Sequence, residues 1–298
     1  MRKESFILLL VACILLTSAF ACRMNPRHPS YEFSINDSLP EGNGQNVKVV
    51  ILSGQSNAAG CSRFSYLQTE PDIDKLSAGY DDVYINFYEA AFERSTDGFV
   101  NVDGNLGIEE GYFGPELGIA DTLASAFPGE KCFILKFTYS GAGLDSTMSP
   151  SKIFFYRYMI KFINDSLSYL RNRNYNPKIV GFCWMQGESD AMEAPDRYRY
   201  NMENLVLSLR SDIRNDLKIF DAAIADIPMY WVNPDVINAA KHSLSETLPD
   251  YYFIDTNALG LTTWNEPLEN PDRAHYDAHS ELELGRLFGN GVITALQE

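Results

Sequence analysis

Short apolar runs that end in small polar residues recur along the chain, and each predicts a buried strand followed by a tight turn. The first run is rich in β-branched residues and leads into a turn that carries Ser56. The second ends in a Ser-Gly-Ala-Gly turn and the third in Gln-Gly-Glu-Ser-Asp. The three runs span residues 49–52, 131–139 and 178–185.

Amphipathic segments with apolar residues at helical spacing lie between these runs, and two further strand-like runs follow. The helices are predicted over 115–127, 153–173, 196–213, 234–248 and 278–296, and the further strands over 218–227 and 251–255. Strand and helix therefore alternate through five cycles. Parallel strands need such crossover helices, so the pattern predicts an α/β fold, a doubly wound three-layer α/β/α sandwich with a five-stranded, mainly parallel sheet.

One stretch does not follow the alternation. Residues 61–105 show no sustained helical periodicity, and we expect an excursion of short elements there. In a doubly wound sheet the ligand site lies outside the carboxyl ends of the strands. The turns at Ser56, Gly141 and Gln186 each follow a predicted strand, so the fold is expected to gather them along one edge.

Composition narrows the class of protein. The 298 residues are 45% hydrophobic and 21% charged, which is enough apolar surface for one catalytic core, expected over residues 46–298. A balance of 24 Lys and Arg against 40 Asp and Glu gives a net charge of −16. Such a surface repels nucleic acid and anionic lipid, and it favours a neutral or weakly charged ligand.

The first residues predict export. Arg2 and Lys3 precede an apolar segment over 6–16 and small residues up to Cys22, the pattern of a signal peptide over residues 1–22. Cleavage before Cys22 fits ordinary export, and a cysteine there also resembles a bacterial lipoprotein signal. The expected location is periplasmic, secreted or at the outer membrane, and the only expected membrane contact is a lipid on Cys22. Residues 23–45 are expected to form a tether.

Three cysteines remain in the mature chain, so at most one internal disulfide can form. Cys132 and Cys183 fall in apolar runs and are expected to be buried small hydrophobes, while Cys61 follows the first turn. No pair or cluster of cysteines has metal-site spacing.

A serine hydroxyl needs a base within hydrogen-bond reach before it can act as a nucleophile. His28 lies in the predicted tether and His242 on a predicted helix face, which leaves His275 and His279. Asp272 is three residues before His275, close enough to reach its Nδ1. The alternative for the first turn is structural, with Ser56 or Asn57 merely capping a helix.

His275 and His279 also have the i, i+4 spacing of a metal pair on a helix. The glutamate of an HExxH motif is absent and no third ligand is apparent, so we expect no metal. The remaining alternative is that both histidines are loop and surface residues.

Four blocks of the chain together resemble those of the SGNH hydrolase superfamily. The closer resemblance is to its sialate O-acetylesterase and acetylxylan esterase branch, carbohydrate esterase family six, and it extends from Val47 to Gly285. A fifth stretch, Phe113-Gly114-Pro115-Glu116, also resembles that branch. The blocks are Gly54-Gln55-Ser56-Asn57, Ser140-Gly141, Trp184-Met185-Gln186-Gly187-Glu188-Ser189-Asp190 and Asp272-Arg273-Ala274-His275.

The resemblance implies an SGNH or flavodoxin-like sheet and a serine esterase without cofactor. It implies Ser56 as nucleophile, His275 as general base and then acid, and Asp272 as the group that orients it. An oxyanion hole would come from the backbone N–H groups of Ser56 and Gly141 and the side chain of Gln186.

Some positions near these residues stay open. The second block lacks the usual paired glycines, so Gly143 is an alternative to Gly141. Gln55, Asn57 and Glu188 are candidates for contacting substrate or ordering loops, and Asp190 is assigned no step. Aromatic residues stack on sugars, and Tyr66, Tyr88, Phe113 and Trp231 lie in or near predicted loops, although core packing explains any one of them.

The expected function is removal of acetyl groups from a polysaccharide or sialic acid through an acyl-enzyme. The alternatives are an esterase acting on a lipid or peptidoglycan ester, and a carbohydrate-binding protein that kept the fold without the chemistry. The presence of Ser56, Gln186, Asp272 and His275 together argues against the last alternative.

Overall fold

The computed structural model describes residues 39–152, 154–227, 229–266 and 272–297. The chain divides into two units, residues 1–32 and 33–298. The predicted signal peptide and lipidation site, residues 1–22, and the first part of the predicted tether lie outside the described residues. All the described residues belong to the second unit.

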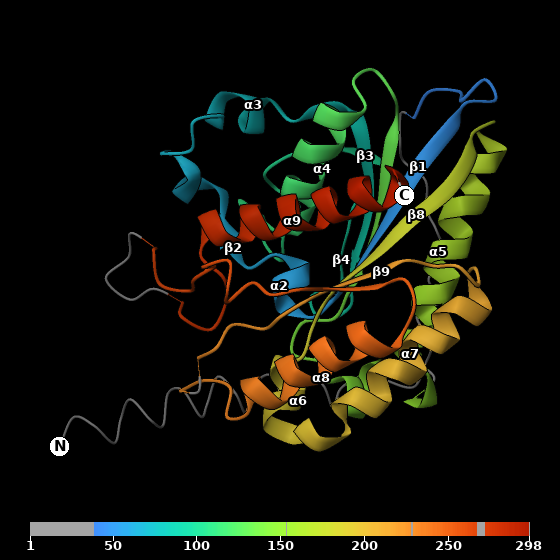
Figure 1. The fold of residues 1–298 in the computed structure, drawn as a ribbon. Coiled ribbons are helices and arrows are strands. Elements are labelled where there is room, and N and C mark those ends of the chain that lie inside the picture. Colours follow the sequence, from blue (N-terminus) through green and yellow to red (C-terminus); the bar gives the residue numbers. More distant parts are fainter. Residues whose placement is uncertain (1–38, 153, 228, 267–271, 298) are drawn as a thin grey trace. The chain divides into compact units, whose positions relative to one another are not determined.

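A single large sheet is the framework of this unit (Figure 1). Among the described residues it has eight strands in the order β10-β9-β8-β1-β7-β3-β4, with β5 also paired to β3. The strands from β10 to β3 run parallel, and β4 and β5 are short antiparallel additions. The strands are β1 (Asn46–Gly54), β3 (Tyr80–Glu89), β4 (Arg94–Ser95), β5 (Val100–Val102), β7 (Cys132–Thr138), β8 (Asn176–Met185), β9 (Ile219–Ala222) and β10 (Tyr251–Ile254).

Helices cover both faces of the sheet, which confirms the three-layer α/β/α class (Figure 1). Helices α4 and α9 pack together on one face, and α5, α7 and α8 lie on the other. Apolar residues at three- and four-residue spacing form the buried side of α5, and a proline opens both α4 and α8. The helices are α4 (Pro115–Ala126), α5 (Phe154–Asn172), α7 (Tyr198–Asp212), α8 (Pro234–Thr247) and α9 (Ala278–Gln297).

Short elements lie between these strands and helices along the chain. They include a two-stranded antiparallel ribbon of β2 and β6. The elements are α2 (Ser56–Ala59), β2 (Ser62–Arg63), η1 (Phe64–Leu67), α3 (Ile73–Ala78), β6 (Tyr112–Phe113), η2 (Leu144–Met148), η3 (Pro150–Lys152), α6 (Glu188–Glu193) and η4 (Pro195–Arg197). Within the described part of the chain, no helix is long and apolar enough to cross a membrane.

The sheet is wider than the five strands predicted because β3 and the short strands β4 and β5 were not recognised. The stretch 61–105, predicted as an excursion of short elements, contains this ten-residue strand next to β7. Its first residues are charged and two polar residues within it are buried, which obscured the strand pattern. Asn86 donates to Ser166 Oγ at 3.0 Å, and Glu89 accepts from the backbone N–H of Ser140 at 2.6 Å.

The last residues of the predicted tether, 39–45, contact the fold. Leu39 is buried, and the backbone N–H groups of Gly42 and Gly44 donate to carbonyls in the turn after α5, at 2.7 Å each. Residues 39–45 are therefore fastened to the fold before β1 begins.

Strand β1 lies at the point where the strand order reverses. Its residues Val49 to Leu52 are fully buried, as expected for a parallel strand covered on both faces. The chain places β7 on one side of β1 and then crosses over to place β8 on the other. Gly54 is level with Thr138 of β7 and Met185 of β8, so three polar turns begin at the same edge. This reversal is where doubly wound sheets bind ligands.

Candidate active site

Ser56 is held at the end of β1 by a turn that only glycine permits. Gly54 has φ +144°, and a Cβ there would lie 1.9 Å from the carbonyl oxygen of Met185. Ser56 then begins α2, where the first N–H groups have no partner within the helix. The residue as a whole is 8% exposed, so it is buried but not completely enclosed. Gln55 is the N-cap and makes no side-chain capping bond, so the capping interpretation of Ser56 and Asn57 is wrong.

His275 and Asp272 are in direct contact, as their spacing predicted. His275 Nδ1 lies 2.6 Å from Asp272 Oδ2, and Asp272 Oδ1 accepts the backbone N–H of Ala274 at 2.9 Å. The aspartate is therefore fixed by its own turn and can fix the imidazole in turn. The side chain of His275 is 22% exposed, so the ring borders solvent while Asp272 orients it.

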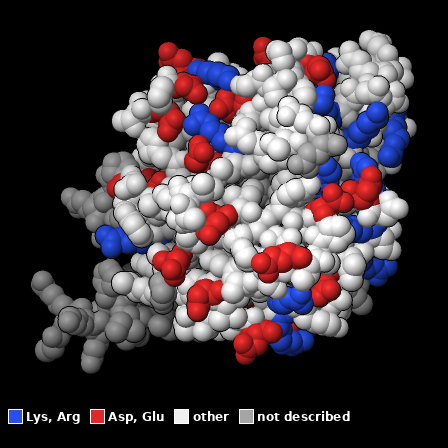
Figure 2. Space-filling model, in the orientation of Figure 1, with Lys and Arg blue, Asp and Glu red and all other residues white. Residues whose placement is uncertain are grey.

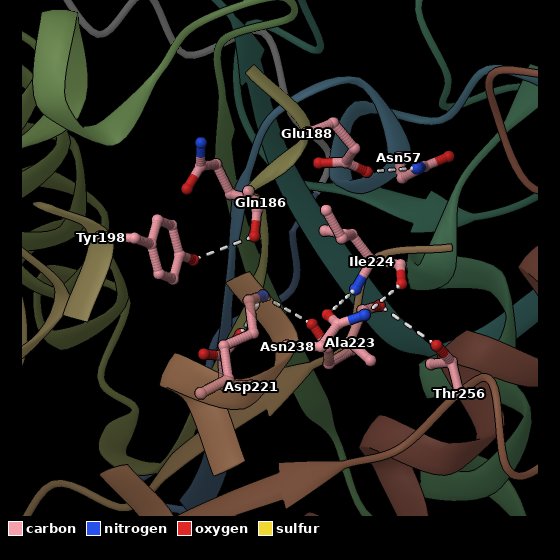
Figure 3. A network of polar contacts seen from close by, with 12 residues as sticks. Asn57, Gln186, Glu188, Tyr198, Asp221, Ala223, Ile224, Asn238 and Thr256 are labelled. Atoms are coloured by element: carbon pink, nitrogen blue, oxygen red, sulfur yellow. Dashed lines mark hydrogen bonds and ion pairs between the residues drawn. The ribbon is translucent and has the colours of Figure 1, made fainter. Parts of the chain in front are cut away.

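Asn57 joins the serine turn to the histidine loop. Its amide oxygen accepts the backbone N–H of Tyr276 at 3.1 Å, and its amide nitrogen donates to Glu188 Oε1 at 2.6 Å (Figure 3). The backbone carbonyl of Tyr276 in turn accepts from Ser62 Oγ at 2.7 Å. The residue after Ser56 thus holds the residue after His275. Asn57 and Glu188 are loop-ordering residues in this arrangement, which was one of the two roles left open for them.

His275 and Asp272 each favour the charged form of the other. Burial raises the pKa of Asp272, but the hydrogen bond and the charge of His275 together outweigh this effect and bring the pKa to about 2. Burial lowers the pKa of His275, whereas the Cys61 sulfur and Asp272 raise it more, so that it lies well above 6.5. Cys61 beside His275 was not foreseen, and its only sequence signal was its place five residues after Ser56.

Gln186 is placed at the expected edge but its amide is already engaged. The side chain is fully buried, and Nε2 donates to Asp190 Oδ2 at 2.6 Å and to Gln55 Oε1 at 3.2 Å. These bonds aim the amide nitrogen away from a free donor role, so the oxyanion prediction for Gln186 gains no support from the geometry. Figure 3 shows Gln186 near Tyr198, whose hydroxyl donates to the Gln186 backbone carbonyl at 3.0 Å.

The amide of Gln55 is held by its oxygen. Besides Gln186 Nε2, Gln55 Oε1 accepts the backbone N–H groups of Gly187 and Ser189, at 3.4 and 3.3 Å. Three N–H donors therefore surround this one oxygen and fix the orientation of the amide. Within the described residues, Gln55 Nε2 makes no hydrogen bond, and this atom is not fully buried. The residue before Ser56 therefore carries an amide nitrogen that is free to donate.

Asp190 ties the turn after β8 to the turn after β7. Besides Gln186, its carboxylate accepts the backbone N–H groups of Leu144 and Asp145, at 2.6 and 2.9 Å. Gly143 lies against this carboxylate, since a Cβ there would be 3.4 Å from Asp190 Oδ2. Gly141 has φ +73° and open space where its Cβ would be. Of the two glycines, Gly141 is the one that faces open space.

Neither histidine pairing nor acidic clustering indicates a metal. His279 lies with its Nδ1 2.5 Å from Glu70 Oε1 and its Nε2 3.2 Å from Thr69 Oγ1, so both ring nitrogens have other partners than His275. No group of three or more metal-ligating side chains occurs in the part of the chain that the structure describes. Cys132 and Cys183 are buried as predicted, and all three cysteines of the described residues are free.

Two of the aromatic candidates for sugar stacking contact other rings of the fold. Phe113 is fully buried with its ring edge-on to Phe64, so core packing accounts for it. Tyr88 is half-buried and stacks on Phe137.

The family model described as carbohydrate esterase, sialic acid-specific acetylesterase, matches residues 46–294. The chain belongs to this family. A search among proteins of curated function gives no match.

Solved structures similar to this esterase share its fold. A protein from Arabidopsis thaliana is 20% identical with a TM-score of 0.61, over 83% of this chain and 98% of the other. NanS is 16% identical with a TM-score of 0.63, over 86% and 99%. A carbohydrate acetylesterase from Xanthomonas citri is 15% identical with a TM-score of 0.58, over 85% and 57%.

The contact between Asp272 and His275 predicts how the imidazole of the esterase titrates. Because Asp272 raises the His275 pKa, Asp272→Asn should lower the titration midpoint of that ring. The ring protons of His275, followed by NMR against pH in the wild type and in the variant, give the two midpoints. An unchanged midpoint in the variant would contradict the assignment.

Proposed function

We propose that this esterase removes acetyl groups from carbohydrate by a Ser56–His275–Asp272 mechanism. The observation that supports it most is the Asn57 amide, which joins the helix of Ser56 to the loop in which His275 contacts Asp272. The carbohydrate esterase family to which the chain belongs supplies the reaction class.

In the proposed reaction, Ser56 Oγ attacks the ester carbonyl while His275 takes its proton. His275 then gives that proton to the departing sugar hydroxyl, leaving an acetyl-enzyme. Water attacks the acetyl group by the same route, with His275 again as base, and acetate and free Ser56 are released. Asp272 holds the ring and stabilises its positive charge in both steps.

The developing oxyanion would be met by the backbone N–H groups of Ser56 and Gly141, at the ends of adjacent strands. We assign the side-chain donor to Gln55 rather than Gln186, because Gln186 Nε2 is bonded to Asp190 while Gln55 Nε2 is free within the described residues. Each such donor is worth about 3 kcal/mol in the barrier.

The proposed substrate is an acetylated polysaccharide or sialic acid. The net charge of −16 disfavours strongly anionic polymers and anionic lipid surfaces. On the face shown in Figure 2, acidic side chains are spread widely with basic ones among them. A neutral or weakly charged sugar suits this surface best.

We also propose that the esterase is exported. The support is the sequence of residues 1–22 alone, with Cys22 as the residue that would carry a lipid. An extracytoplasmic location agrees with an acetylated glycan as substrate.

The nucleophile assignment predicts the result of an acetate-release screen. The chain without residues 1–22 should release acetate from at least one of acetylated xylan, pectin, mannan or sialic acid. Ser56→Ala should lower that turnover by about 10⁴-fold or more. Ser125→Ala, on α4, should keep it, because among the described residues Ser125 Oγ bonds only within its helix and to Lys75. Full turnover by the Ser56 variant would end the assignment.

The oxyanion assignment predicts different outcomes for two identical substitutions. Gln55→Glu keeps the oxygen that three N–H groups bind but removes the free donor, so kcat should fall by about 10²–10³-fold while the fold is kept. Gln186→Glu places a carboxylate against Asp190 and should instead cost about 1–3 kcal/mol of folding free energy. Turnover numbers and urea unfolding distinguish them. Wild-type turnover in Gln55→Glu would refute the role of Gln55.

A further inference from the structure

A fully buried ammonium group contacts the short helix that carries Ser56. Lys136 lies on β7, and its Nζ donates to the carbonyl oxygens of Ala59 and Leu106, at 2.8 Å each. The third bond goes to Glu116 Oε2 at 2.6 Å. The side chains of Lys136 and Glu116 are both 0% exposed. All three N–H donors of the lysine are therefore used, and one of them ends on α2.

Helix α2 depends on such outside contacts. It has four residues, Ser56–Ala59, and a helix this short does not hold its shape alone. Ala59, whose carbonyl Lys136 binds, is its last residue and Ser56 is its first. A hold on the Ala59 carbonyl therefore fixes the helix at the end opposite to the serine.

The turn that opens α4 closes on the same helix. Gly60, with φ +96°, lies so near Gly114 that a Cβ on Gly60 would be 2.5 Å from the Gly114 nitrogen. That nitrogen donates to Glu116 Oε1 at 2.7 Å. The carbonyl of Gly60 accepts the backbone N–H of Ile108 at 3.0 Å. One carboxylate thus binds both the turn that packs on Gly60 and the lysine that binds Ala59.

Stability alone does not account for a charge pair at this place. Burying two charges costs desolvation free energy, and replacing such a pair by apolar side chains is often neutral or stabilising. What apolar side chains cannot do is bind the carbonyls of Ala59 and Leu106. The ammonium group supplies directional contacts to the backbone of the serine helix.

We propose that Lys136 and Glu116 are positioning residues that fix α2 so that Ser56 keeps its place relative to His275. The proposal rests on the proposed function, because it assigns the pair an effect on turnover. It also gives a role to the Phe113-Gly114-Pro115-Glu116 stretch, which the reaction itself leaves without one.

The test replaces the pair by apolar residues of similar size in the full chain, as Lys136→Met with Glu116→Leu. Such a variant should fold, yet it no longer binds the Ala59 carbonyl. With an aryl acetate as substrate, we expect kcat to fall at least tenfold and KM to change less than threefold. Leu170→Ala is the control, since Leu170 is fully buried in the last turn of α5, just before the amino end of β8. It should lower the melting temperature and keep kcat within twofold.

Each outcome decides the question. A folded double variant with wild-type kcat would overturn the proposal, and so would an equal loss of kcat in Leu170→Ala. The swapped variant Lys136→Leu with Glu116→Met is a second route to a folded protein, and failure of both to fold would show a structural role instead. Ser56→Ala, measured alongside, separates the two claims. Turnover that survives this substitution refutes the proposed function and not the positioning role of Lys136 and Glu116.

Discussion

One buried amide connects the parts of this site that are furthest apart in sequence. Asn57 is 1% exposed, and it binds the backbone of Tyr276, 219 residues away, and the carboxylate of Glu188. Only a side chain with a donor and an acceptor can serve both partners. Leaving either partner unpaired in the interior would cost about 1–3 kcal/mol, so the geometry of the site and the stability of its loops depend on the same group.

The sheet brings the segments to one edge, and side-chain contacts then fix them there. Parallel pairing sets the turns after β1, β7 and β8 at the same level. Asp190 links the last two of these turns, and the Gln55 amide links the first and third. Lys136 binds the carbonyl of Ala59, the last residue of the serine helix. Asp190 and Lys136 are buried and paired, and three N–H groups bind the Gln55 amide oxygen, which favours a rigid site over one that forms on binding.

The sequence predicted those features that follow from chain topology and short spacing. Strands ending in polar turns must share an edge, and Asp272 reaches His275 because only three residues separate them. The orientation of the side chains could not be predicted from the sequence. Which way the amides of Gln55 and Gln186 point depends on Asp190 and on backbone N–H groups that only the folded chain assembles. Strand β3 was missed because its buried Asn86 and Glu89 find partners on other elements, which no local pattern reveals.

Lys136 illustrates the same limit. A lysine inside the apolar run 131–139 was visible as an irregularity, but its meaning lies in the carbonyls that surround it. The family comparison and the contacts in the structure support different parts of the proposed function. The comparison identifies a carbohydrate esterase, and the contacts of Asn57, Asp190 and Lys136 explain how this chain can hold such chemistry in place.

The most direct test of this account is the rate at which an organophosphonate modifies Ser56 when the Asn57 amide is removed. Asn86→Ala is the matched control, because Asn86 is likewise fully buried and paired but lies within β3. Asn57→Ala is expected to slow modification at least tenfold, while Asn86→Ala is expected to leave it within twofold. Equal rates in both variants would contradict the claim that this amide holds the proposed nucleophile and its proposed base in place.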